Sequence, residues 1–165
     1  VDRSRGLGDV YKRQFQNLAY ITRVKQILAI KDKYEYIVME RSIFTDRNVF
    51  AKIMEQDGHI NKIEKGLYDQ WFEFLNKDVK VDGYIYIKAD PKTSLERIRK
   101  RNRPGEENIT LEYLEKLHKA HNEWLIQENT TNIDGNDEMS HNYIHNIYSQ
   151  IGWIIKEARG EIYRD

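Results

Sequence analysis

Glu40, Arg41 and Ser42 form a small polar group that directly follows the apolar residues 37–39. A short apolar run of this kind is typical of a strand buried in a parallel sheet, and ligands of such sheets bind beyond the carboxyl ends of the strands. A carboxylate at that edge can hold Mg²⁺ through water, and a guanidinium can bind a phosphate through two hydrogen bonds. On its own, the group has a simpler interpretation as a surface ion pair beside a helix-capping serine.

A second group with possible chemistry is the cationic run RIRKRNR at residues 97–103, which holds five basic residues in seven. Arg97 and Arg101 are four apart, so they share one face of a helix. Arg103 comes just before Pro104 and Gly105, where a helix would end. Such a cluster can close over a triphosphate. Transfer of a phosphoryl group from it would depend mainly on charge stabilisation and positioning. Its simpler interpretation is a solvated basic face.

The composition limits the class of protein. A chain of 165 residues predicts one domain with a sizeable core, and its 27 basic residues balance 27 acidic ones. Any positive patch must therefore be local, which argues against general nucleic-acid binding. The absence of cysteine excludes thiolate chemistry, and no apolar run reaches the length of a membrane span. We expect a soluble cytoplasmic protein that binds neither membranes nor nucleic acids.

The elements that would position these groups alternate along the chain. Strands are predicted at residues 34–39, 84–89 and 130–133, the last one short. Helices are predicted at residues 15–33, 42–56, 62–76, 92–101 and 140–158, and in a further helix that Thr110 caps and that runs to residue 127. This alternation indicates βα crossovers and a parallel sheet, hence the α/β class.

Helical spacing also predicts which side chains face the core. For the helix 42–56 they are Val49, Phe50, Ile53 and Met54. For the helix 62–76 they are Ile63, Leu67, Trp71, Phe74 and Leu75. Two histidine pairs, at 118/121 and 141/145, have spacings that can bind zinc, but with no cysteine and no HExxH pattern we favour a structural role.

Residues 1–14 differ from the rest, because they carry no initiator methionine and no hydrophobic period. They also lack the apolar segment of a signal peptide. We interpret them as a non-native or disordered leader and take residues 15–165 as the folded domain.

Three linked motifs resemble those of the deoxynucleoside kinases. They are Glu40-Arg41-Ser42 with Asp46 and Phe50, the loop Arg101-x-Arg103-x-x-Glu106-Glu107, and the run LEYLEKLHKAHNEWL at 111–125. The resemblance extends from residue 15 to about residue 136. It implies an α/β, three-layer P-loop NTPase fold of the nucleoside and nucleotide kinase kind, with a parallel sheet flanked by helices and incomplete at its N-terminus.

The resemblance also implies roles for individual residues. Glu40 and Arg41 match the catalytic pair, with Glu40 holding Mg²⁺ through water. The base-binding positions are Phe15, Gln16, Arg23, Asp46 and Phe50. Glu106 or Glu107 matches the acid that holds the sugar hydroxyl. The donor-phosphate positions are Arg97, Arg101 and Arg103. A looser match places a donor-adenine loop at residues 137–139. The implied cofactors are ATP and Mg²⁺, and the implied assembly is a homodimer.

Two departures qualify this resemblance. No GxxxxGK[ST] phosphate loop occurs in the sequence, and the strand carrying the family's general base has no counterpart. We therefore expect a fragment of such a kinase, inactive by itself. The alternatives are a thymidylate-kinase-like nucleotide kinase and a non-catalytic phosphate- or nucleic-acid-binding module. Gln16 with the Arg23/Asp46 pair favours a nucleoside acceptor, with deoxycytidine or a purine preferred to thymidine.

Overall fold

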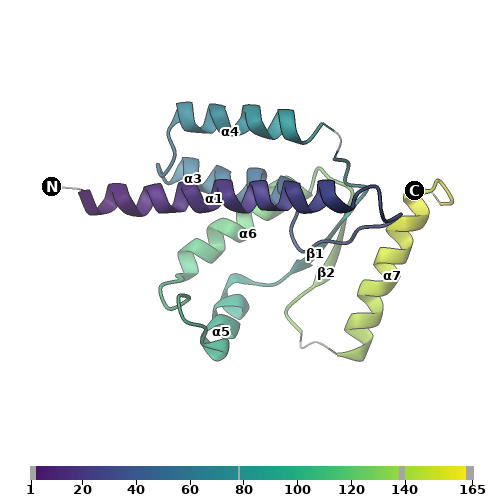
Figure 1. Ribbon diagram of the computed structural model, residues 1–165. Coiled ribbons are helices and arrows are strands. Elements are labelled where there is room, and N and C mark those ends of the chain that lie inside the picture. The colour runs from purple at the N-terminus through teal and green to yellow at the C-terminus, as the bar shows by residue number, and fades with distance from the viewer. Residues whose placement is uncertain (1–2, 78, 138–139, 163–165) are drawn as a thin grey trace. The chain divides into compact units, whose positions relative to one another are not determined.

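A computed structural model describes residues 3–77, 79–137 and 140–162. The chain divides into two compact units, Val1–Lys80 and Val81–Asp165 (Figure 1). Each unit is described by itself. The single domain predicted for residues 15–165 stays a prediction.

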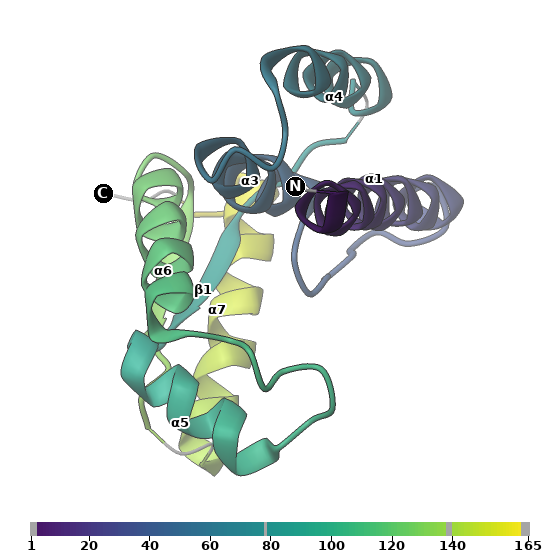
Figure 2. The ribbon, with the colours of Figure 1, turned by 90° about the vertical axis from the view of Figure 1, so that its left-hand side faces the viewer.

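The first unit is helical. It contains α1 (Arg3–Ile30), α2 (Ile43–Thr45), the π-helix η1 (Asp46–Ala51), α3 (Lys52–Gln56) and α4 (Lys62–Leu75). Figure 2, in which these helices are seen nearly end-on, shows α1, α3 and α4 side by side. The predicted helix 15–33 lies largely within α1, and the leader is helical from Arg3 onward. Whether residues 1–14 are native stays a prediction.

The predicted helix 42–56 forms as the consecutive segments α2, η1 and α3. Ser42 caps it, because its hydroxyl accepts a hydrogen bond from the Thr45 amide while the Thr45 hydroxyl accepts one from the Ser42 amide. Gly58, with a φ of 72°, lies just beyond its end. The π-helical stretch was not predicted, and such stretches are frequent at functional sites.

Aromatic side chains form the centre of the core in this unit. The Tyr20 ring of α1 stacks on Phe72 of α4 with 5.8 Å between ring centroids, and it meets Tyr68 at 5.5 Å. The Tyr20 hydroxyl accepts a hydrogen bond of 2.8 Å from the Asn76 amide. Val24 and Ile27 of α1 complete the same buried face.

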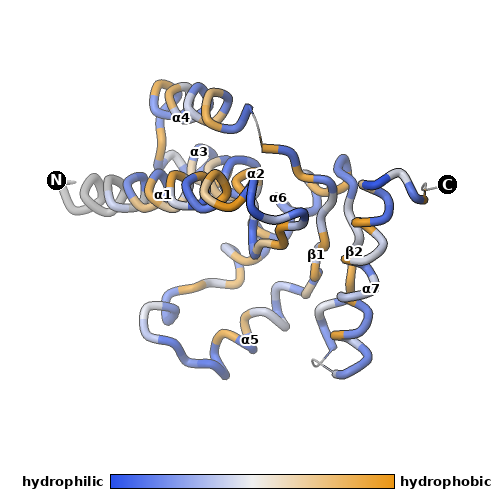
Figure 3. The backbone as a smooth tube through the Cα atoms, turned by 45° about the vertical axis from the view of Figure 1, so that its right-hand side comes forward, coloured by the Kyte–Doolittle hydropathy of each residue, from blue (hydrophilic) through white to orange (hydrophobic). Residues whose placement is uncertain are grey.

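The predicted core face of α4 is wrong for Ile63, Leu67, Trp71 and Phe74, whereas Leu75 packs against the core as predicted. Tyr68 and Phe72 are buried, with Phe72 4% exposed, whereas Phe74 is 70% exposed. Hydrophobic positions alternate with hydrophilic ones along α4 (Figure 3). Two apolar stripes therefore fit the helical period, and the tertiary contacts with Tyr20 decide which one is buried. The exposed stripe of α4 consists of Ile63, Leu67, Trp71 and Phe74.

The predicted strand 34–39 is also wrong, because no described strand pairs with these residues. Tyr36, Ile37 and Val38 are exposed, Val38 by 71%. A strand assigned from an apolar run needs a neighbour that satisfies its backbone hydrogen bonds and covers its side chains. Met39, at the end of the run, packs against the core of the first unit.

The second unit is built on a parallel strand pair. β1 (Tyr84–Lys88) pairs with β2 (Thr130–Asp134), with Tyr84 opposite Thr130 and Lys88 opposite Asp134. The connection between them contains α5 (Pro91–Arg101) and α6 (Leu111–Leu125), and α7 (His141–Ala158) follows β2. These elements confirm the predicted second and third strands and the α/β class. None of the described helices is long and apolar enough to cross a membrane.

A paired substitution tests which face of α4 supports the fold. Phe72→Ala should lower the free energy of unfolding by about 3 kcal/mol, because it removes a buried aromatic ring. Phe74→Ala is the matched control and, at concentrations low enough for the chain to be monomeric, should change the free energy of unfolding by less than about 0.5 kcal/mol, since that ring is exposed in the single chain. Urea unfolding followed by circular dichroism measures both. Equal losses would contradict the assigned face.

Candidate functional site

Asp46, at the start of η1, is the centre of a polar cluster in the first unit. Its side chain is only 3% exposed, and one of its oxygens accepts a hydrogen bond from the Arg23 guanidinium of α1. The Gln16 amide, two helical turns earlier on α1, donates to the Asp46 backbone carbonyl at 3.2 Å. The structure therefore brings together three of the residues predicted to read the base.

The buried position of Asp46 affects its ionisation. Burial raises the pKa of the Asp46 carboxyl above its ordinary value, and it outweighs the lowering by the Arg23 hydrogen bond and by the Arg23 and Arg41 charges. The carboxylate is thus a strong hydrogen-bond acceptor that water screens poorly. Such a group suits recognition of a ligand amino group.

Arg41, a member of the predicted catalytic pair, contacts a residue predicted to bind the base. Its guanidinium lies over the Phe50 ring, 5.2 Å from the centroid. Its backbone is left-handed, with φ of 61°, at the junction between the irregular segment and the Ser42 cap. Left-handed backbone is uncommon for a residue other than glycine and occurs often at functional sites. Glu40 precedes it with an exposed side chain.

Phe15 is separated from this cluster. Its ring is 72% exposed, while the adjacent Gln16 is buried. Successive helical residues point about 100° apart, so Phe15 and Gln16 face different surroundings. In the described structure, the Phe15 ring therefore does not lie with the buried residues that are predicted to contact the base.

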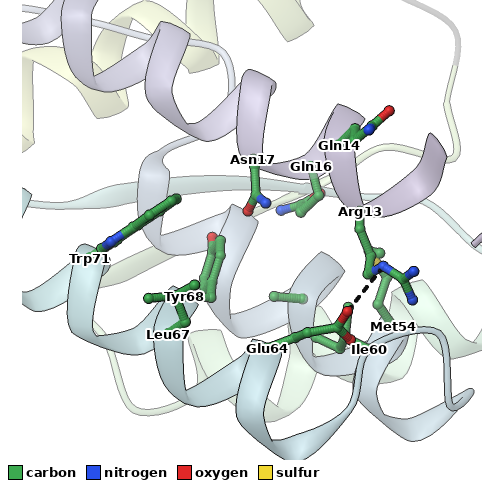
Figure 4. Close-up of a pocket in the computed structure, with 11 residues that line it drawn as sticks. Arg13, Gln14, Gln16, Asn17, Met54, Ile60, Glu64, Leu67, Tyr68 and Trp71 are labelled. Atoms are coloured by element: carbon green, nitrogen blue, oxygen red, sulfur yellow. Dashed lines mark ion pairs between the residues drawn. The ribbon is translucent and has the colours of Figure 1, made fainter. Parts of the chain in front are cut away.

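Tyr68 is a site residue that the sequence interpretation missed. It lines a cavity of ≈ 200 Å³ that Gln16, Asn17, Met54 and Ile60 also line, and Figure 4 shows it reaching from α4 toward Gln16 and Asn17. Its buried hydroxyl has no hydrogen-bond partner in the part of the chain that the structure describes. Burial raises its pKa, and the nearby Asp46 charge adds to this effect. The sequence signal was its spacing of four from Phe72.

The predicted phosphate-binding arginines lie in the second unit, and they differ in their contacts. Arg101, at the end of α5, forms an ion pair of 2.7 Å with Glu106. Arg103 is exposed in the loop that follows. Arg97 donates to three backbone carbonyls, those of Gly135 at 2.5 Å, Asn136 at 2.8 Å and Asp137 at 2.9 Å. Its guanidinium therefore already has a structural role. The other two residues of the predicted donor-adenine loop, 138 and 139, lie outside the described residues.

The two candidate sugar-binding acids also differ. Glu106 is neutralised by Arg101, whereas the exposed Glu107 carboxylate accepts from the Gly105 amide at 2.9 and 3.0 Å. Backbone hydrogen bonds from Glu107 itself and from Gly105 lower the pKa of this carboxyl. Glu107 therefore stays ionised and able to accept a further hydrogen bond.

The histidines show no sign of a metal site. Among the described residues, no group of three or more His, Asp or Glu side chains is placed to hold a metal ion. The ring of His121 stacks on Tyr86 with 5.7 Å between centroids, and its Nδ1 lies 2.8 Å from the Leu117 carbonyl. A packing role accounts for this residue.

In the first unit, a carboxylate held by an arginine beside an amide side chain can bind a small polar ligand, and in the second unit, arginines at a helix end can bind phosphate. The model of the deoxynucleoside kinase family matches residues 9–156. The chain belongs to the deoxynucleoside kinase family, whose members have the P-loop kinase fold. The match begins inside the segment predicted as a leader.

Curated relatives agree with this assignment. Deoxycytidine kinase 2 of Gallus gallus is 39% identical over 130 residues, which cover 73% of this chain and 49% of the relative. The mitochondrial deoxyguanosine kinase of Xenopus laevis is 36% identical over 70% of this chain and 48% of the relative. The deoxycytidine kinase of Homo sapiens is 37% identical over 73% of this chain and 50% of the relative. The chain spans about half the length of these relatives.

The ionisation of Asp46 should make stability depend on pH. Because burial raises its pKa above the ordinary 3.8, protonation favours the folded state. This contribution is complete below about pH 3.8 and is lost as the pH rises through the raised pKa. Asp46→Asn cannot ionise, so its unfolding free energy minus that of the unmodified chain should grow over this interval. Arg23→Ala should raise the pKa of Asp46 further.

Urea unfolding between pH 3.5 and 7.5, with ¹³C NMR titration of the carboxyl, measures both effects. Glu55→Gln, on the exposed surface of α3, controls for a general change of charge. A difference between Asp46→Asn and the unmodified chain that does not vary with pH would contradict the assignment.

Proposed function

We propose that this chain is part of an enzyme that transfers the γ-phosphoryl group of ATP to the 5′-hydroxyl of a deoxyribonucleoside, acting in nucleotide salvage in the cytoplasm. The observation that carries the proposal is the buried Arg23–Asp46 pair beside Gln16, within reach of Arg41. Membership of the deoxynucleoside kinase family supports it. The names of the relatives, which include deoxycytidine and deoxyguanosine kinases, support the substrate class.

The polar cluster favours a base that carries an amino group. Asp46, one of whose carboxylate oxygens accepts from Arg23, can also accept a hydrogen bond from an exocyclic amino group. Gln16 offers an amide donor and acceptor side by side, which match the amino and ring-nitrogen edge of cytosine or adenine. Thymine would present a carbonyl oxygen to the carboxylate, and a buried mismatch of this kind costs roughly 1–3 kcal/mol. We therefore infer deoxycytidine or a purine deoxynucleoside as the acceptor.

The remaining roles follow from charge and position. Arg41 would stabilise the charge that develops during transfer. Glu107 would hold the sugar hydroxyl, because its exposed carboxylate has a lowered pKa and can accept a further hydrogen bond. Glu40 fits a Mg²⁺ ion held through water, since Mg²⁺ is usually bound by one or two carboxylates together with substrate phosphates. When bound, that ion would neutralise donor phosphate charge. Arg101 and Arg103 would contact the phosphates.

The exposed stripe of α4 supports the homodimer. Ile63, Leu67, Trp71 and Phe74 leave an apolar face uncovered, and Leu18 of α1 is 65% exposed in the same unit. Contiguous exposed apolar faces of this kind mark interaction surfaces. We propose that a second copy of the chain covers this face.

The enzyme activity and the base preference share one assay. A full-length protein that contains this chain should phosphorylate deoxycytidine or purine deoxynucleosides with a kcat/KM at least about tenfold above that for thymidine. Replacing Arg23 and Asp46 together by small apolar residues should reduce this preference in kcat/KM or reverse it in favour of thymidine. Absence of phosphoryl transfer to any of the four deoxynucleosides would overturn the function, and a preference for thymidine would overturn only the base assignment.

The dimer is tested by changing its proposed interface. The unmodified chain should sediment as a dimer at micromolar concentration, and Leu67→Glu with Trp71→Glu should make it monomeric, because two charges cannot be buried there. Ile126→Glu, at an apolar residue of the second unit that is 83% exposed, serves as the control. Sedimentation equilibrium distinguishes the species. A dimer that survives the double change would place its interface elsewhere.

A further inference from the structure

Arg47 directly follows Asp46 in the π-helix η1, and the side chains of these two residues bind different helices. Asp46 accepts a hydrogen bond from Arg23 of α1, whereas the Nε of Arg47 donates to Asp69 of α4 at 3.1 Å. In the first ion pair η1 supplies the anion, and in the second it supplies the cation. Two consecutive residues of opposite charge therefore hold the start of η1 to α1 and to α4.

The contact of Arg47 with α4 involves more than one isolated ion pair. The guanidinium lies over the Phe72 ring, 4.7 Å from the centroid. Asp69 also binds Lys65 at 2.5 Å, and a Glu73 oxygen lies 4.0 Å from the Arg47 guanidinium. Isolated ion pairs on a surface contribute little, but a network whose cation is also stacked on an aromatic ring restricts where that cation can lie. This network gives Arg47 a defined direction.

Phe72 connects this network to the core of the first unit. Its buried ring stacks on Tyr20 of α1 and meets Phe44 of α2 edge-on, with 5.4 Å between the centroids of the latter pair. Arg47 thus rests on a ring that α1 and α2 also contact. A rotation of η1 relative to α4 would break the ion pair and the ring contact of Arg47 together. The packed core therefore supports the direction of η1 through this one side chain.

The direction of η1 matters because it carries two of the residues predicted to bind the base. Asp46 begins η1, and Phe50, which lies under the Arg41 guanidinium, belongs to the same six residues. The Asp46 backbone carbonyl also accepts from Gln16. π-Helical stretches are rare and short, so one at this place depends on its surroundings. Because Arg47 is bound to α4 while Asp46 binds α1, Arg47 can influence a ligand at Asp46 without contacting that ligand.

We propose that Arg47 is a positioning residue for recognition of the acceptor. Together with Asp69 it fixes the rotation of η1 against α4, so that the Asp46 carboxylate and the Phe50 ring stay aligned for the base of the deoxynucleoside. The part of this inference that concerns the acceptor rests on the proposed kinase function, whereas the anchoring of η1 does not.

The anchoring is tested on the chain itself by hydrogen–deuterium exchange. Arg47→Ala and Asp69→Ala should each make the amides of η1 exchange about tenfold faster, because each removes the ion pair that holds η1 to α4. The double variant should add little to either single change, because both break the same link. Unchanged exchange in both single variants, or fully additive effects, would overturn the anchoring.

Two features of the design separate anchoring from a general loss of structure. Lys65→Ala is the matched control, because it removes the other cation bound to Asp69 and should leave the exchange of η1 unchanged. Amides of α1 report whether the unit remains folded. Asp69→Ala leaves the sequence of η1 intact, so it decides the question if Arg47→Ala lowers the folded fraction.

The role in acceptor recognition is tested by kinetics on a full-length protein that contains this chain. Arg47→Ala and Asp69→Ala should each raise the KM for the preferred deoxynucleoside about tenfold and reduce its preference over thymidine, while the KM for ATP stays unchanged. A smaller folded fraction alone would lower the apparent kcat and leave both KM values as they are. Lys65→Ala should behave like the unmodified enzyme.

Two results would overturn the positioning role. One is faster exchange in η1 with an unchanged KM for the deoxynucleoside, which would reduce Arg47 to a structural residue. The other is an equal rise of the KM for ATP and for the deoxynucleoside, which would show that its effect is not specific to the acceptor. An enzyme without any nucleoside kinase activity would refute the proposed function, while the exchange experiment would still decide the anchoring.

Discussion

The first unit is organised around one buried carboxylate. An ionised side chain that is almost fully removed from water is costly unless charges and hydrogen bonds compensate it, and breaking a buried ion pair costs about 3–5 kcal/mol. Asp46 obtains this compensation from Arg23 on α1 and from the more distant charge of Arg41. Because these partners come from separate segments, the carboxylate fixes how the start of the π-helix lies against α1. The same requirement explains why a ligand amino group would bind there favourably.

The second unit depends on a different constraint, the close approach of chain segments at the carboxyl edge of β1 and β2. Gly135 is required there because β1 leaves no room for a side chain. The backbone carbonyls that follow β2 cannot all pair within the two strands, so Arg97 satisfies three of them. A cation that a charge-pattern interpretation assigns to a ligand is therefore already used by the fold. Charge patterns report where cations occur, and only the surrounding carbonyls show which of them remain available.

Much of this arrangement could be predicted from the sequence, and the failures share a cause. The Ser42 and Thr110 caps and the two paired strands depend on interactions between residues near in sequence or on a strong local pattern, and they were placed correctly. The strand at 34–39 and the buried face of α4 depend on which distant segment covers an apolar surface. Local periodicity carries no information about that choice. The contact of Arg23 with Asp46 was anticipated only through the family resemblance, since the two are 23 residues apart.

In the loop after α5, one acidic residue pairs with a predicted phosphate ligand, and the next acidic residue is the predicted sugar ligand. Arg101, a predicted phosphate ligand, is held by Glu106, next to the predicted sugar ligand Glu107. An ion pair that is partly open to water contributes little to stability, so a triphosphate can replace Glu106 as the partner of Arg101 at small cost. The Glu106 amide still donates to the Arg103 carbonyl, and the Ile109 amide donates to the Glu106 carbonyl, so exchange of the partner of Arg101 would leave the backbone around Glu107 in place.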